Sequence, residues 1–145
     1  MKCVVHVCEN LTQSHSAFLE SIEGGLGILA DLSRADVLLY CPLAADRAVV
    51  VAQSRPHSIL PIHSESQLGR QATFADELDV MHALLEGRQG LTEVRRANGK
   101  PRSPDAGAPI VQETYPIRAP DGQVVAALSI ETNLIERERH RRRSK

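Results

Sequence analysis

The chain has 145 residues, 42% of them hydrophobic and 24% charged, with a formal net charge of −1 at pH 7. This composition is that of one soluble globular domain, without the overall basic charge that would indicate a nucleic-acid partner. No stretch reaches the roughly 20 apolar residues needed to span a bilayer, so no membrane association is expected. Three cysteines without CxxC spacing, Cys3, Cys8 and Cys41, favour a reducing cytoplasm.

The first expected element is a long amphipathic helix. It follows Asn10, a possible cap, and ends near Ser33. Apolar residues recur every three or four positions along one face: Leu11, His15, Phe18, Ile22, Leu26 and Leu29. Three glycines inside it allow either close packing or a kink: Gly24, Gly25 and Gly27. His15 is expected to be a packing residue or part of a dimer face.

Two strands are expected at 35–42 and 47–54. They are too close in sequence for a parallel crossover, so they must be antiparallel neighbours. The segment 56–66 is extended, and Pro56 and Pro61 limit it to an edge or an irregular strand.

A second helix is expected after Thr73, with Asp76 completing a variant of the capping box. Gly87 ends this helix. Its apolar face is expected to comprise Phe74, Leu78, Met81 and Leu85. A short strand at 90–96 and a loop rich in glycine and proline at 97–109 follow.

The stretch 113–132, ETYPIRAPDGQVVAALSIET, predicts a β-hairpin whose turn is Ala119–Pro120–Asp121–Gly122 with a glycine bulge. In the first strand Glu113, Tyr115 and their alternate neighbours share the more apolar face. Glu113 therefore lies near the strand end in solvent, pairs with an arginine, or lines a cavity. The second strand is apolar on both faces, which places it in the middle of the sheet.

These elements predict an α+β domain, in which helices pack against an antiparallel sheet. Residues 1–135 form this domain. Residues 136–145 are expected to begin a basic helix that connects to further domains.

Three stretches, ADLSRADVLLYCP, VVAQSRPHS and GAPIVQETYPIRAPDGQVVAALSIETNL, resemble the amino-terminal GAF-type sensor domain of soluble bacterial two-component histidine kinases. The resemblance covers residues 10–135. Its most specific pieces are Gln53–Pro56, Glu113–Arg118 and Glu131–Leu134.

The resemblance implies a GAF-like fold with a central antiparallel sheet of about six strands and a pocket on one side. It also implies a PAS domain and a kinase core downstream. The expected function is that of a non-catalytic cytoplasmic sensory domain, which biases the kinase through dimeric connecting helices. His82 and His140 lack the flanking pattern of a phosphoacceptor, so kinase activity is expected to belong to the downstream parts.

A small-molecule pocket, if present, is expected to be lined by polar residues on or beside the sheet. They are Tyr40, Gln53, His63, Glu113 and Tyr115. The second helix would then form its lid. The sequence identifies neither the ligand nor a cofactor.

Two alternatives stay open. Cys3, His6 and Cys8 have ligand types suited to zinc or copper, which would make a metal- or redox-responsive module. Cys41 with Cys3 or Cys8 would instead serve a stand-alone thiol reductase of the GAF type. As a single residue, Cys41 is expected to be a small buried hydrophobe.

The expected partner is a second copy of the chain. A parallel dimer would form through the long first helix and the terminal helix. On this hypothesis, charged residues in place of Leu26 and Leu29 weaken the dimer.

Overall fold

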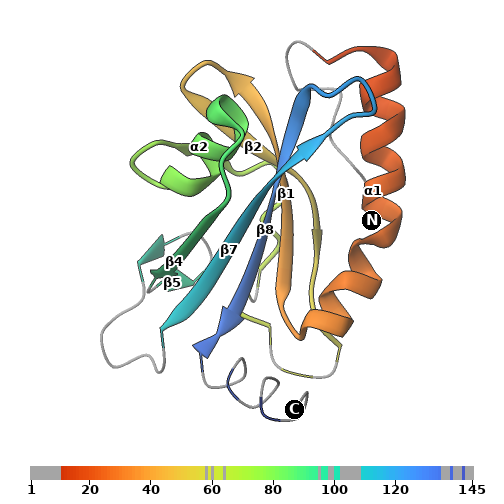
Figure 1. Cartoon of the computed structure of the whole chain (residues 1–145). Coiled ribbons are helices and arrows are strands. Elements are labelled where there is room, and N and C mark those ends of the chain that lie inside the picture. The colour runs from red at the N-terminus through yellow and green to blue at the C-terminus, as the bar shows by residue number, and fades with distance from the viewer. Residues whose placement is uncertain are drawn as a thin grey trace.

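An antiparallel sheet of six strands separates the two helices that the described residues form in full, as seen in Figure 1. This computed structural model describes residues 11–57, 59, 61–63, 65–94, 96, 97, 100, 101, 109–134, 138 and 142. The helices are α1 (Gln13–Ser33) and α2 (Leu78–Glu86). The strands of the main sheet are β1 (Asp36–Ala44), β2 (Arg47–Ser54), β3 (Gln71–Thr73), β4 (Gly90–Val94), β7 (Ile110–Arg118) and β8 (Val124–Asn133). A separate two-stranded sheet pairs β5 (Arg96–Ala97) with β6 (Lys100–Pro101).

The strand order β3-β2-β1-β8-β7-β4 confirms the predicted α+β, GAF-like architecture. The strand β8 lies between β1 and β7, so the return strand of the predicted hairpin is indeed central. The edge strand β3 was not predicted. The described part of the segment 56–66 contains no strand, so the expected edge or irregular strand is wrong for these residues.

Helix α1 packs against β1, β2 and β8. The N-cap of α1 is Thr12, so the predicted cap Asn10 is wrong. Asn10 itself lies outside the described residues. The Thr12 side chain accepts a hydrogen bond from the His15 backbone N–H at 3.1 Å. The buried side of the helix includes the predicted His15 and Leu26 together with Leu19 and Ala30, which the sequence analysis did not single out.

The expected dimer face is wrong, because Leu26 is buried inside the domain. Leu26 is 1% exposed and belongs to the core between α1 and the sheet, and Leu29 packs against that core. The apolar residues on the open side of α1 are Ile28 and Leu32, which are 69% and 70% exposed. One continuous helix runs through the three glycines.

The hairpin turn forms as predicted and is attached to the start of α1. Gly122 has φ +89° and donates its N–H to the Ala119 carbonyl at 2.8 Å. The imidazole of His15 bonds through Nε2 to the Asp121 carboxylate at 2.9 Å. This bond is the main cause that lowers the pKa of Asp121 from its usual value of 3.8. His15 is therefore a packing residue that joins two distant segments.

The predicted apolar face of α2 is wrong except at Met81. The helix begins later than expected, because Thr73 and Asp76 hydrogen-bond to each other in a turn that precedes it. From Leu78 onward, α2 turns Val80, Met81 and Ala83 toward the sheet. The remaining predicted residues are exposed: Phe74, Leu78 and Leu85.

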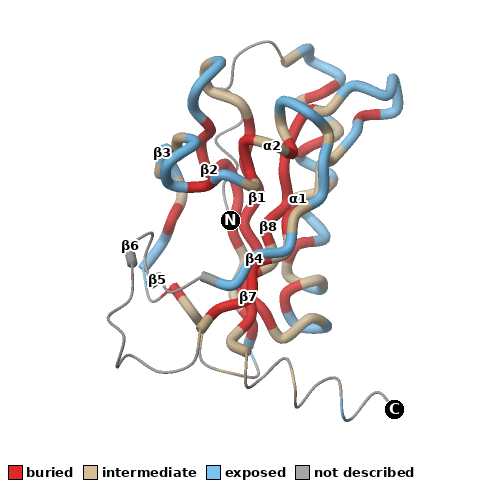
Figure 2. Tube along the Cα trace, turned by 60° about the vertical axis from the view of Figure 1, so that its left-hand side comes forward, coloured by how far each residue is buried: buried red, intermediate tan, exposed pale blue. Residues whose placement is uncertain are grey.

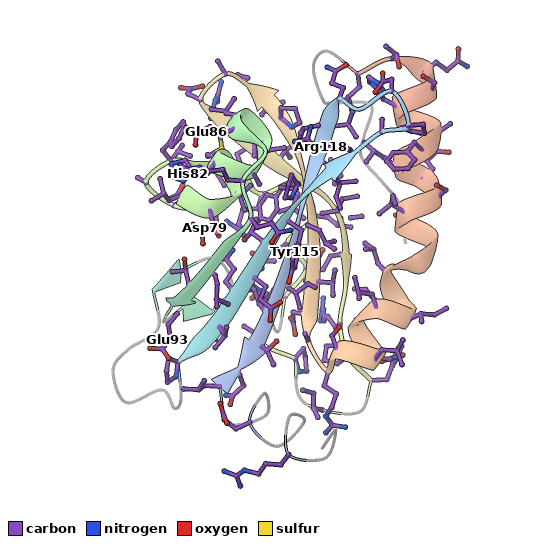
Figure 3. All side chains as sticks on the ribbon, in the orientation of Figure 1. Asp79, His82, Glu86, Glu93, Tyr115 and Arg118 are labelled. Carbon is purple, nitrogen blue, oxygen red and sulfur yellow. The ribbon has the colours of Figure 1, made fainter. Side chains whose placement is uncertain are left out.

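The end of α2 agrees with the prediction. Gly87 adopts the left-handed conformation with φ +67° and caps the helix. A Cβ at this position would lie 2.6 Å from the Arg118 guanidinium, which is labelled in Figure 3. Only glycine fits here without displacing that side chain.

The sheet carries one apolar cluster on each face, and Figure 2 shows the buried strands running through the molecule between exposed helix surfaces. The cluster beneath α1 contains Val37, Leu39 and Cys41 of β1. The cluster beneath α2 contains Leu38 and Tyr40 of the same strand. This alternation follows from the two-residue period of a strand.

Replacing Leu26 by Ala is expected to lower the free energy of unfolding by about 3 kcal/mol, because it leaves a cavity in a closed core. The matched control is Leu32→Ala, the same change on the open side of the same helix, with an expected effect within about 0.5 kcal/mol. Urea denaturation monitored by circular dichroism measures both. Equal losses for the two variants would contradict the assigned helix orientation.

Candidate functional site

Polar side chains occupy one end of the sheet face beneath α2, where an apolar core would be expected. Asp36, Glu131 and Gln112 lie side by side on β1, β8 and β7. In the next row Ser129 pairs with Thr114. All five residues are buried. The face of β7 that carries Gln112 and Thr114 is therefore buried, and it lies opposite the face that carries Glu113 and Tyr115.

A β-bulge adds Gln53 to this group. Leu39 pairs with Ala52 but Tyr40 pairs with Val50, so Val51 is an extra residue in β2. The bulge shifts the alternation, and Gln53 pairs with Leu38 on the α2 face instead of facing α1. Its Oε1 accepts a hydrogen bond from the Gln67 backbone N–H at 2.7 Å.

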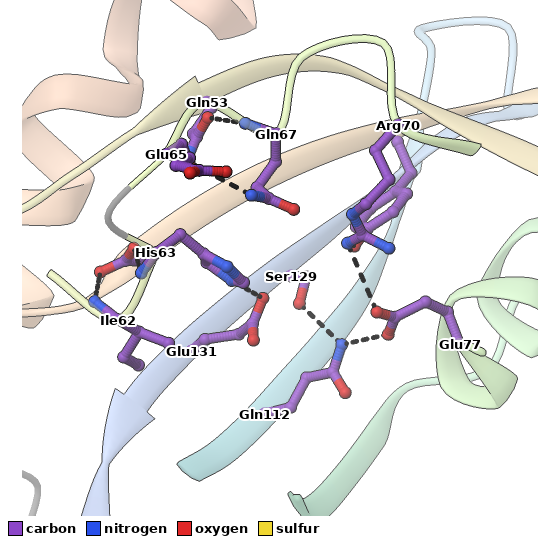
Figure 4. Close-up of polar contacts among 12 residues, drawn as sticks. Gln53, Ile62, His63, Glu65, Gln67, Arg70, Glu77, Gln112, Ser129 and Glu131 are labelled. Carbon is purple, nitrogen blue, oxygen red and sulfur yellow. Dashed lines mark hydrogen bonds and ion pairs between the residues drawn. The ribbon is translucent and has the colours of Figure 1, made fainter. Parts of the chain in front are cut away.

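The segment that precedes β3 lies over these strands, and so does the N-cap residue of α2 (Figure 4). The segment contributes His63, Gln67 and Arg70, and the N-cap is Glu77. We call these four residues and the six of the sheet the polar cluster. The six on the sheet are Asp36, Gln53, Gln112, Thr114, Ser129 and Glu131. The polar cluster includes nine of the eleven buried polar or charged residues in the described part of the chain.

Two carboxylates hold the segment around His63 on the sheet. The imidazole Nε2 of His63 lies 3.2 Å from Oε2 of Glu131, and both side chains are fully buried. Asp36 accepts the backbone N–H groups of Ile62 and His63 at 2.9 and 3.0 Å. Burial nevertheless raises the pKa of Asp36, and the neighbouring Glu131 adds to this effect.

A second chain of contacts ties α2 to the sheet. The Arg70 guanidinium donates to the Tyr40 hydroxyl at 2.8 Å and pairs with the Glu77 carboxylate at 3.5 Å. Gln112 donates to Glu77 at 2.9 Å and to Ser129 at 3.0 Å. Burial lowers the pKa of Arg70, but Tyr40, Glu77 and Glu131 raise it by more. The guanidinium therefore stays charged.

Four atoms of the polar cluster have no hydrogen-bond partner among the described residues although they are buried. They are Oε1 of Gln67, Nε of Arg70, Oγ1 of Thr114 and Oε1 of Glu131. Each such atom costs about 1–3 kcal/mol unless something hydrogen-bonds to it. Water or a bound molecule would remove this cost.

The structure divides the five predicted site residues between the two faces of the sheet. Tyr40, Gln53 and His63 belong to the α2 face. Glu113 and Tyr115 lie on the opposite face, where the Tyr115 hydroxyl donates to Glu113 at 2.6 Å. The two groups cannot line one cavity, because the sheet separates them.

Glu113 and Tyr115 line a shallow, open cavity of about 390 Å³, together with Gln89, Gly90 and Leu91. Of the three expectations for Glu113, lining a cavity is thus met. A second open cavity of about 420 Å³ lies beside the end of β2. Gln53, Ser54, Ser66 and Leu68 contribute to its lining, so Gln53 connects this cavity to the polar cluster.

The sequence analysis missed most of the polar cluster. One signal was present: Ser129 and Glu131 alternate with Leu128 and Ile130 in a strand interpreted as apolar on both faces. The partners from the loop, Gln67 and Arg70, gave no such signal, because they are brought to the sheet only by tertiary folding.

Cys41 is fully buried beneath α1, as predicted for a small hydrophobe. Cys3, His6 and Cys8 lie outside the described residues. Within the described residues no three His, Cys, Asp or Glu side chains are grouped to hold a metal ion. No helix in this part of the chain is long and apolar enough to cross a membrane.

A family model described as the GAF domain of the histidine kinase PdtaS matches residues 1–145. The chain belongs to this family. It is accordingly a GAF sensor domain of the histidine-kinase type, and the polar cluster lies within it. No curated protein matches the chain.

Solved structures show the same fold at low sequence identity. The sensor region of a sensor histidine kinase is 22% identical with a TM-score of 0.68, and the match covers 91% of this GAF domain and 40% of that chain. An IclR-type transcriptional regulator from Silicibacter sp. TM1040 is 13% identical, with a TM-score of 0.59 and coverage of 86% and 60%. The inducer-binding domain of the transcription factor PobR from Acinetobacter, in complex with 3-hydroxybenzoic acid, is 13% identical, with a TM-score of 0.53 and coverage of 79% and 82%.

Replacing Arg70 by Met is expected to lower the free energy of unfolding by about 3 kcal/mol, because it leaves the buried Glu77 carboxylate without its cation. Adding Glu77→Gln should recover part of this loss, since the charge is then removed as well. Chemical denaturation of the single and double variants measures the coupling.

The matched control is Arg88→Met, which breaks an exposed pair with Glu86. An exposed pair contributes about 1 kcal/mol or less. A loss for Arg70→Met no larger than for the control would show that the Arg70–Glu77 contact does not hold α2 in place.

Proposed function

We propose that this GAF domain is the cytoplasmic sensory domain of a two-component histidine kinase, and that it binds a small molecule in the polar cluster. The observation that supports a ligand is the set of buried atoms without partners among the described residues, which belong to the sheet and to the segment that covers it. A domain optimised for stability alone would have apolar side chains in place of these groups. Tyr40, Gln53 and His63 remain proposed ligand residues, and Glu113 and Tyr115 line a separate cavity.

The proposed mechanism is a shift of population between two arrangements of the covering segment. A ligand that bonds to Glu131 competes for, or strengthens, the contact with His63. The strand β8 that carries Glu131 ends two residues later at Asn133 and leads toward the C-terminal residues. A PAS domain and a kinase core downstream would receive the change through connecting helices. The shift requires that the ligand binds one arrangement more tightly than the other.

The proposed dimer uses the open side of α1, in place of the Leu26 face. Along this side the exposed residues are small near the middle and apolar toward the end: Ala17, Ser21, Gly24, Gly25, Ile28 and Leu32. A Cβ on Gly24 or Gly25 would meet nothing within 4 Å, so both glycines are open to a partner helix. Small residues allow two helices to approach at the short end of the usual 8–10 Å range.

Replacing Ile28 and Leu32 together by Glu is expected to weaken the dimer by at least about tenfold, because carboxylates would be buried at the interface. The fold should be retained, since both positions are exposed. Sedimentation velocity measures the change. The matched control places Glu at Leu78 and Leu85, which are 52% and 53% exposed on α2. Equal dimerisation of both double variants would exclude this face of α1.

Replacing Thr114 by Val is expected to raise the free energy of unfolding of the ligand-free domain by about 1 kcal/mol, because it removes a buried hydroxyl without a partner. Ser129→Ala is the matched control. It should lower stability by about 1 kcal/mol, since Ser129 accepts a hydrogen bond from Gln112. Chemical denaturation measures both.

The same Thr114→Val change, made in the kinase that contains this domain, should reduce the response of autophosphorylation to the signal. A variant that is more stable and responds normally would show that the Thr114 hydroxyl takes no part in binding the ligand. A variant as destabilised as Ser129→Ala would show that the hydroxyl has a structural partner.

A further inference from the structure

The charges of the polar cluster do not balance. Three carboxylates, those of Asp36, Glu77 and Glu131, are fully or almost fully buried. Among the residues that the structure describes, they face one guanidinium, that of Arg70, and a positive charge on His63 as well would still leave one negative charge in excess. These are also the only carboxylates buried in the described part of the chain, so the imbalance is local to this site. A buried excess charge is costly without a counter-charge.

The hydrogen bonds show which carboxylate lacks a donor. Asp36 accepts two backbone N–H groups, and Glu77 is bonded by Arg70 and Gln112. Glu131 has the imidazole of His63 on Oε2, while no described residue donates to Oε1. Because Glu131 pairs directly with Asp36 across the sheet, its free oxygen lies at the most negative part of the cluster.

The other unpaired atoms define what a bound molecule must offer. Oε1 of Gln67 is a second acceptor without a donor, and Oγ1 of Thr114 can either donate or accept. Nε of Arg70 is a donor without an acceptor. Figure 4 shows the side chains of Gln67, Arg70 and Glu131 arranged around Ser129. To satisfy all of these atoms, a bound molecule must supply several N–H donors and one hydrogen-bond acceptor.

We propose that the ligand of the polar cluster is a small organic cation, a primary amine or an amidine that also carries one hydrogen-bond acceptor. Its cationic group bonds to Oε1 of Glu131 and Oε1 of Gln67, and its acceptor faces Nε of Arg70. This inference rests on the proposed sensory function and specifies the charge of the molecule that is sensed. Bound water would satisfy the same atoms but would not offset the charge.

Two further observations agree with a cation. Burial is the main cause that raises the pKa of Asp36, and the negative charge of the neighbouring Glu131 raises it slightly further. The open cavity beside β2 is lined by Gln53, whose Oε1 accepts from the Gln67 backbone, so this cavity lies next to the polar cluster.

Three probes that differ only at one end of a four-carbon chain test the charge: 4-amino-1-butanol, 1,4-butanediol and 4-hydroxybutanoate. Thermal unfolding of the whole 145-residue chain is measured with each probe at equal ionic strength. The amine is expected to raise Tm by about 4 °C at ten times its dissociation constant. The diol and the carboxylate should leave Tm unchanged.

Glu131→Gln keeps the shape of the side chain and removes its charge, so it should abolish the shift with the amine. The matched control Glu86→Gln changes an exposed carboxylate on α2 and should leave the shift intact. If Glu131→Gln does not fold, as judged by circular dichroism, Gln67→Met removes the second acceptor and is expected to reduce the shift.

Stabilisation by 4-hydroxybutanoate rather than by the amine would overturn the proposed charge, while a ligand site in the polar cluster would stand. An amine effect that persists in both Glu131→Gln and Gln67→Met would place its binding elsewhere and overturn the inference. No shift with any probe would also overturn it. Native mass spectrometry of the untagged chain then tests the sensory proposal separately, by detecting any molecule that remains bound.

Discussion

The buried carboxylate of Glu131, held against the imidazole of His63, determines how the face of the sheet beneath α2 is built. A carboxylate at the centre of a sheet is unfavourable unless donors reach it. The chain supplies them by laying an irregular segment across the strands, whose backbone bonds to Asp36 and whose side chains reach Glu131, Tyr40 and Glu77. The segment is irregular because both its backbone and its side chains must donate to the same face of the sheet. A regular strand would turn half of its polar groups away from the sheet.

The two faces of the sheet consequently have different mechanical properties. Beneath α1 the contacts are apolar and close-packed, and one of the few polar links is the His15–Asp121 bond to the hairpin turn. Such an interface resists small displacements. Beneath α2 an apolar cluster covers only part of the face, and the polar cluster beside it consists of hydrogen bonds with several partners missing. Rearranging these bonds exchanges one polar contact for another. The α2 face is suited to respond to a bound molecule, and the α1 face to hold the scaffold and any dimer unchanged.

Local patterns predicted most of the fold, because the stripe of α1, the paired strands and the Pro-Asp-Gly turn depend on residues close in sequence. The exceptions have a common cause. The orientation of α2 follows from Glu77, which bonds to Gln112, 35 residues away in sequence. The face of Gln53 follows from a bulge set by pairing with β1. Such non-local contacts leave no periodic signal, so Tyr40, Gln53 and His63 could be proposed but their loop partners Gln67 and Arg70 could not.

The bulge in β2 and the alternation in β8 together determine which side chains reach the proposed binding site. The bulge turns Gln53 into the polar cluster, where it fixes Gln67 through its backbone. The alternation places Ser129 and Glu131 on the same face, on the last strand before the C-terminal segment. A molecule between Gln67 and Glu131 would contact both the covering segment and β8, the strand that precedes the C-terminal residues. Coupling between the bound molecule and the C-terminal residues then requires no long pathway, because Glu131 belongs both to the proposed binding site and to β8.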